Sequence, residues 1–268
     1  MKGSLSFRVR ISLPIVLLAL ANSSYLAYSQ SVSATASGQT SAQVLTQALN
    51  AMGGSAAWTQ VSDATLIGNC TTPQGQDGTA PATEPFRWIT QAGEFRYESG
   101  STGQLYVLLS GHGAPSNASP SGTQNLISET SALLKPFHLP GQVFATILND
   151  PSYVASVVAP SGPADSATIH IHVVHQLSRA VEFNSQQDWW LDASTYLPVS
   201  VTFRVPGQAI RSYMLETYTF SAWSAEKFGA VLPHQITTSM SVGILAQTCT
   251  TTEVQINTQP AASLFDAR

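Results

Sequence analysis

Two histidines on one predicted strand form the sharpest metal-binding pattern in the sequence. His170 and His172 flank Ile171, and His175 follows three residues after the second. Alternate side chains of a strand share a face, so His170 and His172 would present two imidazoles, which suit zinc or copper. A metal site needs further ligands, and His175 would face the other way. We therefore expect a solvent-exposed pair opposite the buried Ile171, and His170 and His172 are only weak metal candidates.

No other residue pattern predicts catalysis. The sequence contains no Gly-x-Ser-x-Gly elbow, no Walker motif and no dinucleotide fingerprint. Asp188 and Asp192 could be imagined as paired carboxylates, but roles at a strand and a turn explain them. We expect no catalytic residue and no cofactor, and the chain is predicted not to be an enzyme. A metal-dependent enzyme at His170 and His172 stays open as an alternative.

The two cysteines of the chain are predicted to form a disulfide. Cys70 and Cys249 lie far apart in the sequence, and an even cysteine count in an exported protein favours a bridge. The bridge would require an early strand to lie close to a late one. It would stabilise the fold by about 3–5 kcal/mol in the chain-entropy model. The alternative is two buried free thiols on separate strands.

The N-terminal segment reads as a signal peptide over residues 1–29. Three basic residues lie within positions 2–10, an apolar run covers 11–21, and Ala27-Tyr28-Ser29 has the small-x-small pattern of a cleavage site. The apolar run is too short for a membrane span, and no other stretch approaches about 20 apolar residues. We expect an exported protein without a transmembrane span in the mature chain, either periplasmic or secreted.

Composition predicts one large β domain over residues 30–268. Its length of roughly 240 residues is within the range of a single β domain. Only 10% of the residues are charged, and a sequence rich in threonine and poor in charge suits strands. Loss of the three basic residues of the signal peptide leaves 8 basic against 15 acidic residues, a net charge of −7. This charge argues against a nucleic-acid partner.

The clearest structural element is a hairpin over residues 188–203. Trp189 and Leu191 alternate with Asp188, Trp190 and Asp192, as in a strand with two unlike faces. Asp192 can hydrogen-bond its own backbone two residues on and so make the turn. In the second strand, Leu197, Val199, Val201 and Phe203 would share one face. Pro198 cannot donate to a ladder, which favours a strand edge or the start of a strand there.

Further strands and two helices are predicted around this hairpin. A first helix covers residues 42–52, with Ser41 as its cap and Gly53-Gly54 as its stop. A second helix follows Leu139-Pro140, because proline suits the first turn. Its apolar side would carry Val143, Phe144, Ile147 and Leu148. Strands are predicted at 64–71, 86–90, 94–98, 104–110, 154–158, 168–174, 179–183, 212–221, 235–242 and 244–256.

A series of short motifs runs through residues 42–265. It consists of Met52-Gly53-Gly54 followed by Trp58, Phe95-Arg96-Tyr97, the helix after Leu139-Pro140, Trp190-Leu191-Asp192 with Leu197-Pro198, Val231-Leu232-Pro233-His234-Gln235-Ile236, and Ser263-Leu264-Phe265. In order and spacing, this series resembles the outer-membrane lipoprotein carrier and sorting superfamily, the LolA-like group that includes mycobacterial lipid-binding lipoproteins.

The resemblance implies an α+β fold, a strongly curved antiparallel sheet or incomplete barrel whose concave face is covered by the two helices. In such relatives, the space between sheet and helices holds acyl chains. The side chains that would then line a hydrophobic cavity are Trp88, Tyr97, Tyr106, Val143, Phe144, Ile147, Leu148 and Trp189. The alternative for the aromatic residues among them is ordinary packing between strands.

Two further hypotheses follow from this pattern. The first is a non-catalytic carrier or binding protein for a lipid, an acyl chain or a lipoprotein in the bacterial envelope, since an apolar pocket is the usual ligand site. The second is a structural or interaction module with a filled core and an exposed sheet edge, which would bind an envelope protein partner.

Overall fold

The structure is a computed structural model that describes residues 39–74, 78, 80–92, 94–100, 106–110, 123–125, 137–160, 167–176, 185–206, 213–240 and 247–265. The expected signal peptide over residues 1–29 and the expected strand at 179–183 lie outside these residues.

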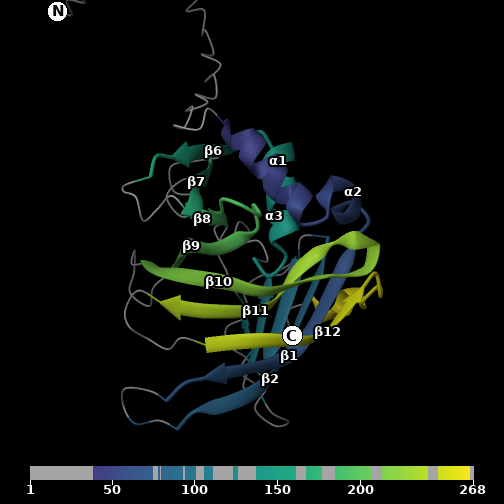
Figure 1. Cartoon of the computed structure of the whole chain (residues 1–268). Helices are drawn as coiled ribbons and strands as arrows, with labels where there is room; N and C mark the ends of the chain where they lie inside the picture. The colour runs from purple at the N-terminus through teal and green to yellow at the C-terminus, as the bar shows by residue number, and fades with distance from the viewer. Residues whose placement is uncertain are drawn as a thin grey trace, which may run out of the picture. The chain divides into compact units, whose positions relative to one another are not determined.

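The described part of the chain forms one twelve-stranded sheet in the order β5-β4-β3-β2-β1-β12-β11-β10-β9-β8-β7-β6 (Figure 1). Neighbouring strands are antiparallel except for β4 and β5, which are parallel. The strands are β1 Asp63–Thr72, β2 Ala82–Gln91, β3 Glu94–Ser99, β4 Tyr106–Ser110, β5 Thr123–Asn125, β6 Tyr153–Val158, β7 Thr168–His175, β8 Gln187–Asp192, β9 Pro198–Pro206, β10 Tyr213–Ala225, β11 Val231–Met240 and β12 Gln247–Ile256.

The first and last strands meet inside the sheet, and the predicted disulfide joins them there. Cys70 of β1 stands directly opposite Cys249 of β12, with their Cα atoms 3.9 Å apart and their sulfurs bonded. The bridge spans a sequence separation of 179 residues. The disulfide prediction is therefore confirmed.

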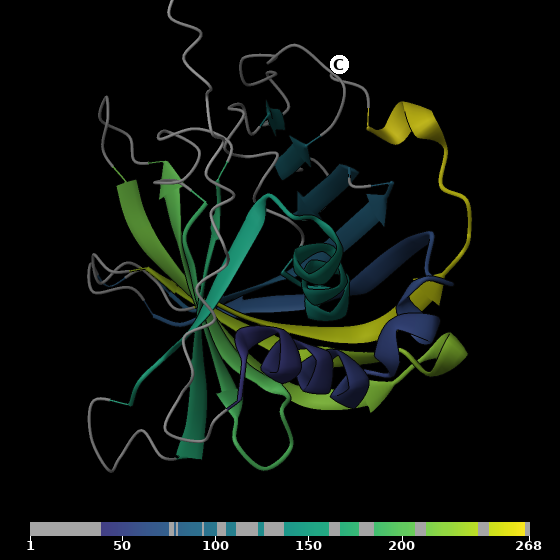
Figure 2. The same cartoon turned by 90° about the horizontal axis from the view of Figure 1, so that it is seen from above.

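Three α-helices lie on one face of the sheet: α1 Ser41–Ala51, α2 Gly54–Trp58 and α3 Pro140–Asn149. Figure 2 shows α1 and α3 beside each other across this face. The cap of α1 is Thr40, one residue before the predicted Ser41, because Thr40 and Gln43 form a reciprocal capping box. Pro140 occupies the first turn of α3, as predicted. The described residues also form two short 3₁₀ helices, η3 Lys227–Gly229 and η4 Ala262–Leu264.

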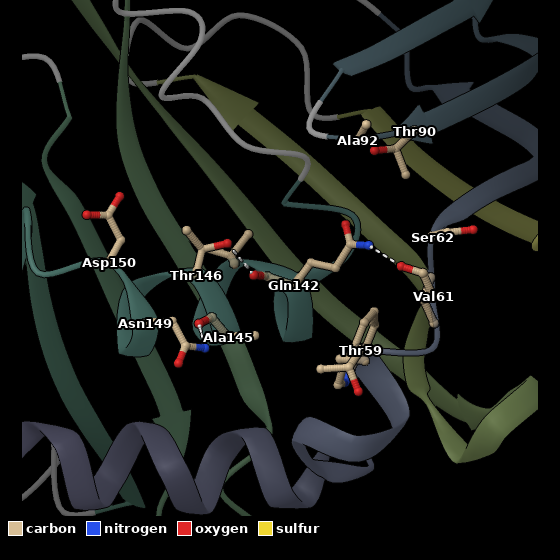
Figure 3. A pocket seen from close by; sticks show the side chains of 12 residues that line it. Thr59, Val61, Ser62, Thr90, Ala92, Gln142, Ala145, Thr146, Asn149 and Asp150 are labelled. Atoms are coloured by element: carbon tan, nitrogen blue, oxygen red, sulfur yellow. Dashed lines mark hydrogen bonds between the residues drawn. The ribbon is translucent and has the colours of Figure 1, made fainter. Parts of the chain in front are cut away.

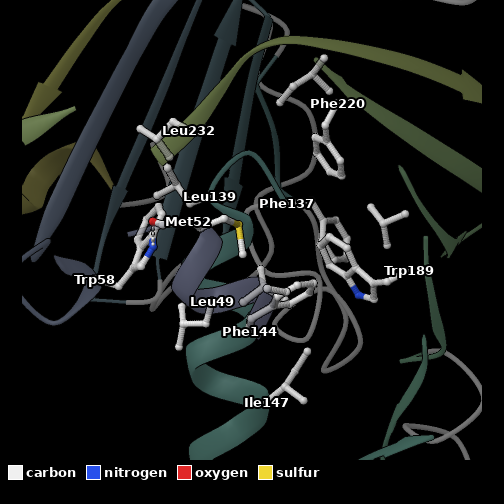
Figure 4. Packing of buried hydrophobic residues seen from close by; sticks show 14 of the residues in the cluster. Leu49, Met52, Trp58, Phe137, Leu139, Phe144, Ile147, Trp189, Phe220 and Leu232 are labelled. Atoms are coloured by element: carbon white, nitrogen blue, oxygen red, sulfur yellow. Dashed lines mark hydrogen bonds between the residues drawn. The ribbon is translucent and has the colours of Figure 1, made fainter. Parts of the chain in front are cut away.

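The hydrophobic core fills the space between these helices and the sheet (Figure 4). Phe144 of α3 meets Trp189 of β8 edge to face, with ring centroids 4.6 Å apart, and both side chains are fully buried. From α1, Met52 is also fully buried. Large apolar side chains from both layers thus interdigitate.

The opposite face of the sheet is polar. Threonine hydroxyls pair across neighbouring strands, with Oγ1–Oγ1 distances of 2.8 Å for Thr202 and Thr217 and 3.0 Å for Thr237 and Thr248. An antiparallel sheet with one covered and one solvated face accounts for the alternation seen in the sequence.

The hairpin of β8 and β9 forms as predicted, with one correction. Asp192 Oδ1 accepts hydrogen bonds from Ser194 and Thr195, and these bonds lower the pKa of Asp192 to about 2. Val201 is buried, but Val199 is 36% exposed. A register shift pairs Trp190 with Ser200 and Leu191 with Pro198, so Val199 is an extra residue that bulges outward.

The α+β architecture with N-terminal and mid-chain helices is confirmed, while the expected barrel is only partly present. The sheet is neither closed nor strongly curled. Its edge strands β5 and β6 stand at opposite ends of the strand order and do not pair with each other. Without that pairing there is no closure, which requires every strand to have two neighbours.

Candidate binding cavity

The histidine pair lies on the polar face of the sheet, as expected. Asp188 Oδ1 on β8 accepts hydrogen bonds from His170 Nε2 at 2.8 Å and His172 Nδ1 at 2.9 Å. The His170 ring stacks on Trp190, with centroids 4.6 Å apart, while His175 is buried on the other face. Burial opposes ionisation of Asp188, but the bonds from both histidines outweigh it, so the pKa of Asp188 is lowered.

This cluster is a hydrogen-bonded surface network. Within the residues that the structure describes, no group of three or more His, Cys, Asp or Glu side chains is arranged to hold a metal ion. The same oxygen of Asp188 engages both imidazoles. The cluster therefore gives no support to a metal-dependent reaction at His170 and His172.

Most of the predicted cavity residues lie in the packed core. The buried ones are Trp88, Val143, Phe144, Ile147 and Trp189, and Tyr97 and Leu148 pack against the same cluster. For Tyr106, on β4, the structure describes the backbone alone. Side chains therefore occupy the region between helices and sheet where the resemblance places an acyl chain.

An open cavity lies beside α3, with a volume of about 480 Å³ (Figure 3). Its walls come from the end of α2 and the turn after it, the end of β2, and the outward side of α3. The lining residues are Trp58, Thr59, Val61, Ser62, Thr90, Ala92, Gln142, Val143, Ala145, Thr146, Asn149 and Asp150. Val143 is the one predicted cavity residue among the described lining.

The wall between α2 and α3 depends on Trp58. Its Nε1 donates to Met52 O at 2.8 Å, which holds the indole against the start of α3. Gly141 allows the contact, because a Cβ at this position would stand 2.0 Å from Trp58 Cε2. Figure 3 shows Gln142 reaching across the cavity to Val61, where Nε2 donates to the backbone oxygen at 3.4 Å.

One end of the cavity is negative. Asp150 follows the last residue of α3, and its Oδ1 accepts from Ser152 N at 2.9 Å. Its Oδ2 stands 3.9 Å from His175 Nε2. The last turn of α3 contains no basic residue. Because the C-terminus of a helix carries partial negative charge, Asp150 and the helix end act in the same direction.

A second set of titratable groups lies on the inner face, away from the cavity lining. His138 stacks on Trp88 with centroids 4.1 Å apart, and burial lowers the pKa of His138 to about 3. Burial also raises the pKa of Glu216 on β10 to about 7 and that of Tyr218 well above its usual value. Trp88 Nε1 and His138 Nδ1 are buried without a hydrogen-bond partner among the described residues.

The sequence did not predict that the polar side of α3 lines a cavity, because the cavity residues were chosen from the apolar stripe of this helix. Gln142, Thr146 and Asn149 recur at spacings of four and three residues, so they share one helix face. Such a polar stripe is usually solvated, and only the fold places it against Trp58 and the end of β2.

Comparison with known proteins gives a distant structural similarity. The chain is similar to an outer membrane lipoprotein-sorting protein domain from Vibrio parahaemolyticus (TM-score 0.48, 12% identity, 84% of this chain and 95% of that one). It is also similar to a LolA superfamily protein from Nitrosomonas europaea (TM-score 0.47, 11% identity, 84% and 98%). A third is a DUF1329 family protein from Desulfovibrio piger (TM-score 0.45, 11% identity, 83% and 95%).

These three structures share the course of most of this chain at 11–12% identity. No family model matches the sequence, and no curated protein matches it. At this identity the similarity concerns the course of the chain, and the function is argued below from the residues of this protein. Among the described residues, no helix is both long enough and apolar enough to cross a membrane.

Proposed function

We propose that this chain is an exported, non-catalytic binding protein for an amphiphile, and that the amphiphile enters at the cavity beside α3. The cavity itself is the observation that carries the proposal. Its 480 Å³ lies within the range of about 300–1,000 Å³ that small-molecule sites occupy. Its lining combines apolar side chains, including Trp58 and Val143, with a polar stripe, which suits a ligand with two unlike ends.

The apolar chain of a longer ligand would extend from this cavity into the core. Val143 is itself buried but borders the cavity, and Phe144 and Ile147 are buried on the same helix. A shift of α3 away from the sheet would make the apolar residues listed from the sequence available to a ligand. Each methylene buried in this way contributes about 0.8 kcal/mol. In this proposal, α3 acts as a movable cover over one face of the open sheet.

An extracytoplasmic location supports such a role. The disulfide between Cys70 and Cys249 is typical of exported proteins, because cytosolic thiols are kept reduced. We propose that residues 1–29 are removed as a signal peptide and that residues 30–268 form one domain. A lipid or lipoprotein acyl chain in the bacterial envelope is the expected class of cargo.

Native mass spectrometry tests the proposal. The mature chain, purified from an envelope extract, should carry a stoichiometric adduct that solvent extraction identifies as an acyl-containing molecule. Ala145→Trp should abolish the adduct by filling the cavity, while Ala42→Trp on the exposed side of α1 should leave it. A clean unliganded mass, unchanged after incubation with mixed lipids, would contradict the proposal.

One observation favours a second candidate, an envelope interaction module. The core beneath α1 and α3 is filled, with Leu45, Met52 and Phe144 no more than 1% exposed. A protein that binds a partner through its surface needs no movable cover. Failure of all lipids to bind, together with capture of one envelope protein by chemical crosslinking, would favour this candidate.

A further inference from the structure

The hydrogen-bonding chemistry of the cavity wall points to a particular class of ligand head group. The hydrogen bonds of the polar side chains in the described lining show which of their donors are already used. Thr146 Oγ1 donates to Gln142 O at 2.9 Å, and Asn149 Nδ2 donates to Ala145 O at 2.7 Å. Gln142 Nε2 donates to Val61 O. On α3, the side-chain donors are therefore turned toward the protein backbone.

The other walls show the same arrangement. Thr90 Oγ1 donates to Glu94 O at 3.0 Å, and Thr59 Oγ1 donates to Ala56 O at 3.1 Å. Ser62 Oγ lies 3.1 Å from Asp63 Oδ2, a carboxylate oxygen that can only accept. A hydroxyl has one hydrogen and two lone pairs, so each of these groups keeps acceptor capacity after its donor is used.

The lining is consequently rich in acceptors and poor in donors. Asp150 adds a carboxylate, and the second N–H of each amide is the side-chain donor that remains. None of the described lining residues is Lys or Arg. A phosphate, sulfate or carboxylate needs donors or positive charge, and this wall offers little of either. A primary ammonium group has three donors and no acceptor, which is the complement of this wall.

Electrostatics at the same place favour a cation. The cavity runs along the C-terminal half of α3 to Asp150, where the helix dipole and the carboxylate are both negative. Asp150 already accepts from Ser152 N and stands 3.9 Å from His175 Nε2, so its contribution to the ligand is charge at short range. Trp58 supplies an apolar wall of the same cavity.

We propose that the cavity beside α3 selects a cationic amphiphile and receives its primary ammonium group among the acceptors of Gln142, Thr146 and Asn149. This inference rests on the proposed function and specifies its ligand. The apolar part of the ligand would lie against Trp58, Val61 and Val143.

Four probes with the same eight-carbon chain test the inference by isothermal titration calorimetry on the mature chain. Octylammonium should bind at least tenfold more tightly than octanoate. Octyltrimethylammonium carries the same charge without N–H donors, and it should bind at least fivefold more weakly than octylammonium. Octyl glucoside, an uncharged probe, should bind more weakly than octylammonium. Measurement at 150 mM salt limits general attraction to a negatively charged protein, because salt screens surface charges.

Two variants locate the site. Thr146→Val should weaken octylammonium at least fivefold while changing octyltrimethylammonium less than twofold. Asp150→Asn should weaken both cations. The matched control is Thr46→Val on α1, where Oγ1 donates to Ala42 O at 2.7 Å in the same way but outside the cavity lining. If Thr146→Val unfolds, Asn149→Ala at the exposed end of α3 replaces it with the same expectation.

The outcomes separate this inference from the proposed function. If none of the four probes and no lipid of a mixture binds, both the ammonium inference and the proposed function are rejected. Equal binding of all four probes, or tightest binding of octanoate, would overturn the ammonium inference and leave an amphiphile-binding protein. Tightest binding of octylammonium that neither Thr146→Val nor Asp150→Asn weakens would place the cation elsewhere and overturn the inference.

Discussion

Gly141 at the start of α3 lies so close to Trp58 that a Cβ atom there would stand 2.0 Å from the indole Cε2 and 2.2 Å from Nε1. No real Cβ contact is that short, so the two elements meet only because residue 141 lacks a side chain. The indole is held from the other side by its bond to Met52 O. One glycine thus sets how closely α3 approaches α2, and with it the width of the candidate cavity.

Gly141→Ala is expected to destabilise the fold by about 1–3 kcal/mol, as overpacking of a core does. The added methyl would force Trp58 or α3 to move. Urea unfolding should show the loss, and Trp58→Phe combined with Gly141→Ala should recover part of it, because the smaller ring leaves space. A fully additive double variant would contradict direct contact between the two residues.

Removal of the disulfide is expected to lower the free energy of unfolding by about 4–5 kcal/mol, since the bridge closes a very long loop. The comparison is between the native protein and Cys70→Ala/Cys249→Ala in urea, with and without reductant. Reductant should lower the stability of the native protein toward that of the variant and leave the variant unchanged. Equal stability of the two oxidised proteins would contradict the prediction.

Glu216 is expected to make the fold less stable as pH rises. It faces the interior from β10 between Phe203 and Met240, and burial raises its pKa from 4.5 to about 7. Between these values the unfolded chain has lost the proton that the folded chain retains. Stability therefore falls as pH rises from about 4.5 to 7, by up to about 3 kcal/mol at about 1.4 kcal/mol per pKa unit.

Urea unfolding between pH 5 and pH 8 measures this effect. Glu216→Gln should remove the fall, because the amide does not titrate. Glu253→Gln on the exposed face of β12 should preserve it and serves as the control. A native-like pH slope in Glu216→Gln would show that another group causes the dependence.

His138 is expected to make the fold less stable as pH falls, the opposite of the effect of Glu216. Burial lowers its pKa from 6.5 to about 3, so below pH 6.5 the unfolded chain takes up a proton that the folded chain does not. Stability is lost as pH falls through this range. His138→Phe keeps a ring against Trp88 and removes a buried nitrogen without a partner among the described residues.

The His138→Phe variant should be more stable than the native protein by about 1–3 kcal/mol at pH 7, the usual cost of an unsatisfied buried polar group. Thermal unfolding at pH 7 and pH 5 should show a difference that grows at the lower pH. A destabilised variant would mean that Nδ1 has a partner, such as a buried water, whose loss outweighs the gain.

Local patterns in the sequence determined much of the fold. Alternation placed Trp189 inside and Asp188 outside, and Asp192 marked the turn between β8 and β9. Proline at position 140 located the start of α3. The chain re-enters a helix at α2 because Gly53 takes a left-handed conformation, with φ of +101°, and turns the backbone. The sequence had suggested that the glycine pair only ends a helix.

The order of motifs in the sequence suggested a resemblance to the LolA-like group, and that resemblance led to the predicted cavity residues. The predicted cavity residues were chosen for their apolar character, and that choice selected core residues. Burial favours large apolar side chains whether they contact a ligand or one another. Sequence alone cannot separate these two cases.

The sequence by itself determined most of the strands, the two longer helices and the cysteine pair, because each element depends on neighbours within a few residues and the chain has only two cysteines. It did not predict α2 or β5, and it placed Val199 on the wrong face. Tertiary structure alone decided that the sheet stays open, that the core beneath the helices is filled, and that Thr90 and Thr146 line one cavity. Those two threonines come from distant strand and helix positions. Their closeness follows from long-range packing of α3 against Trp58, which no local pattern specifies.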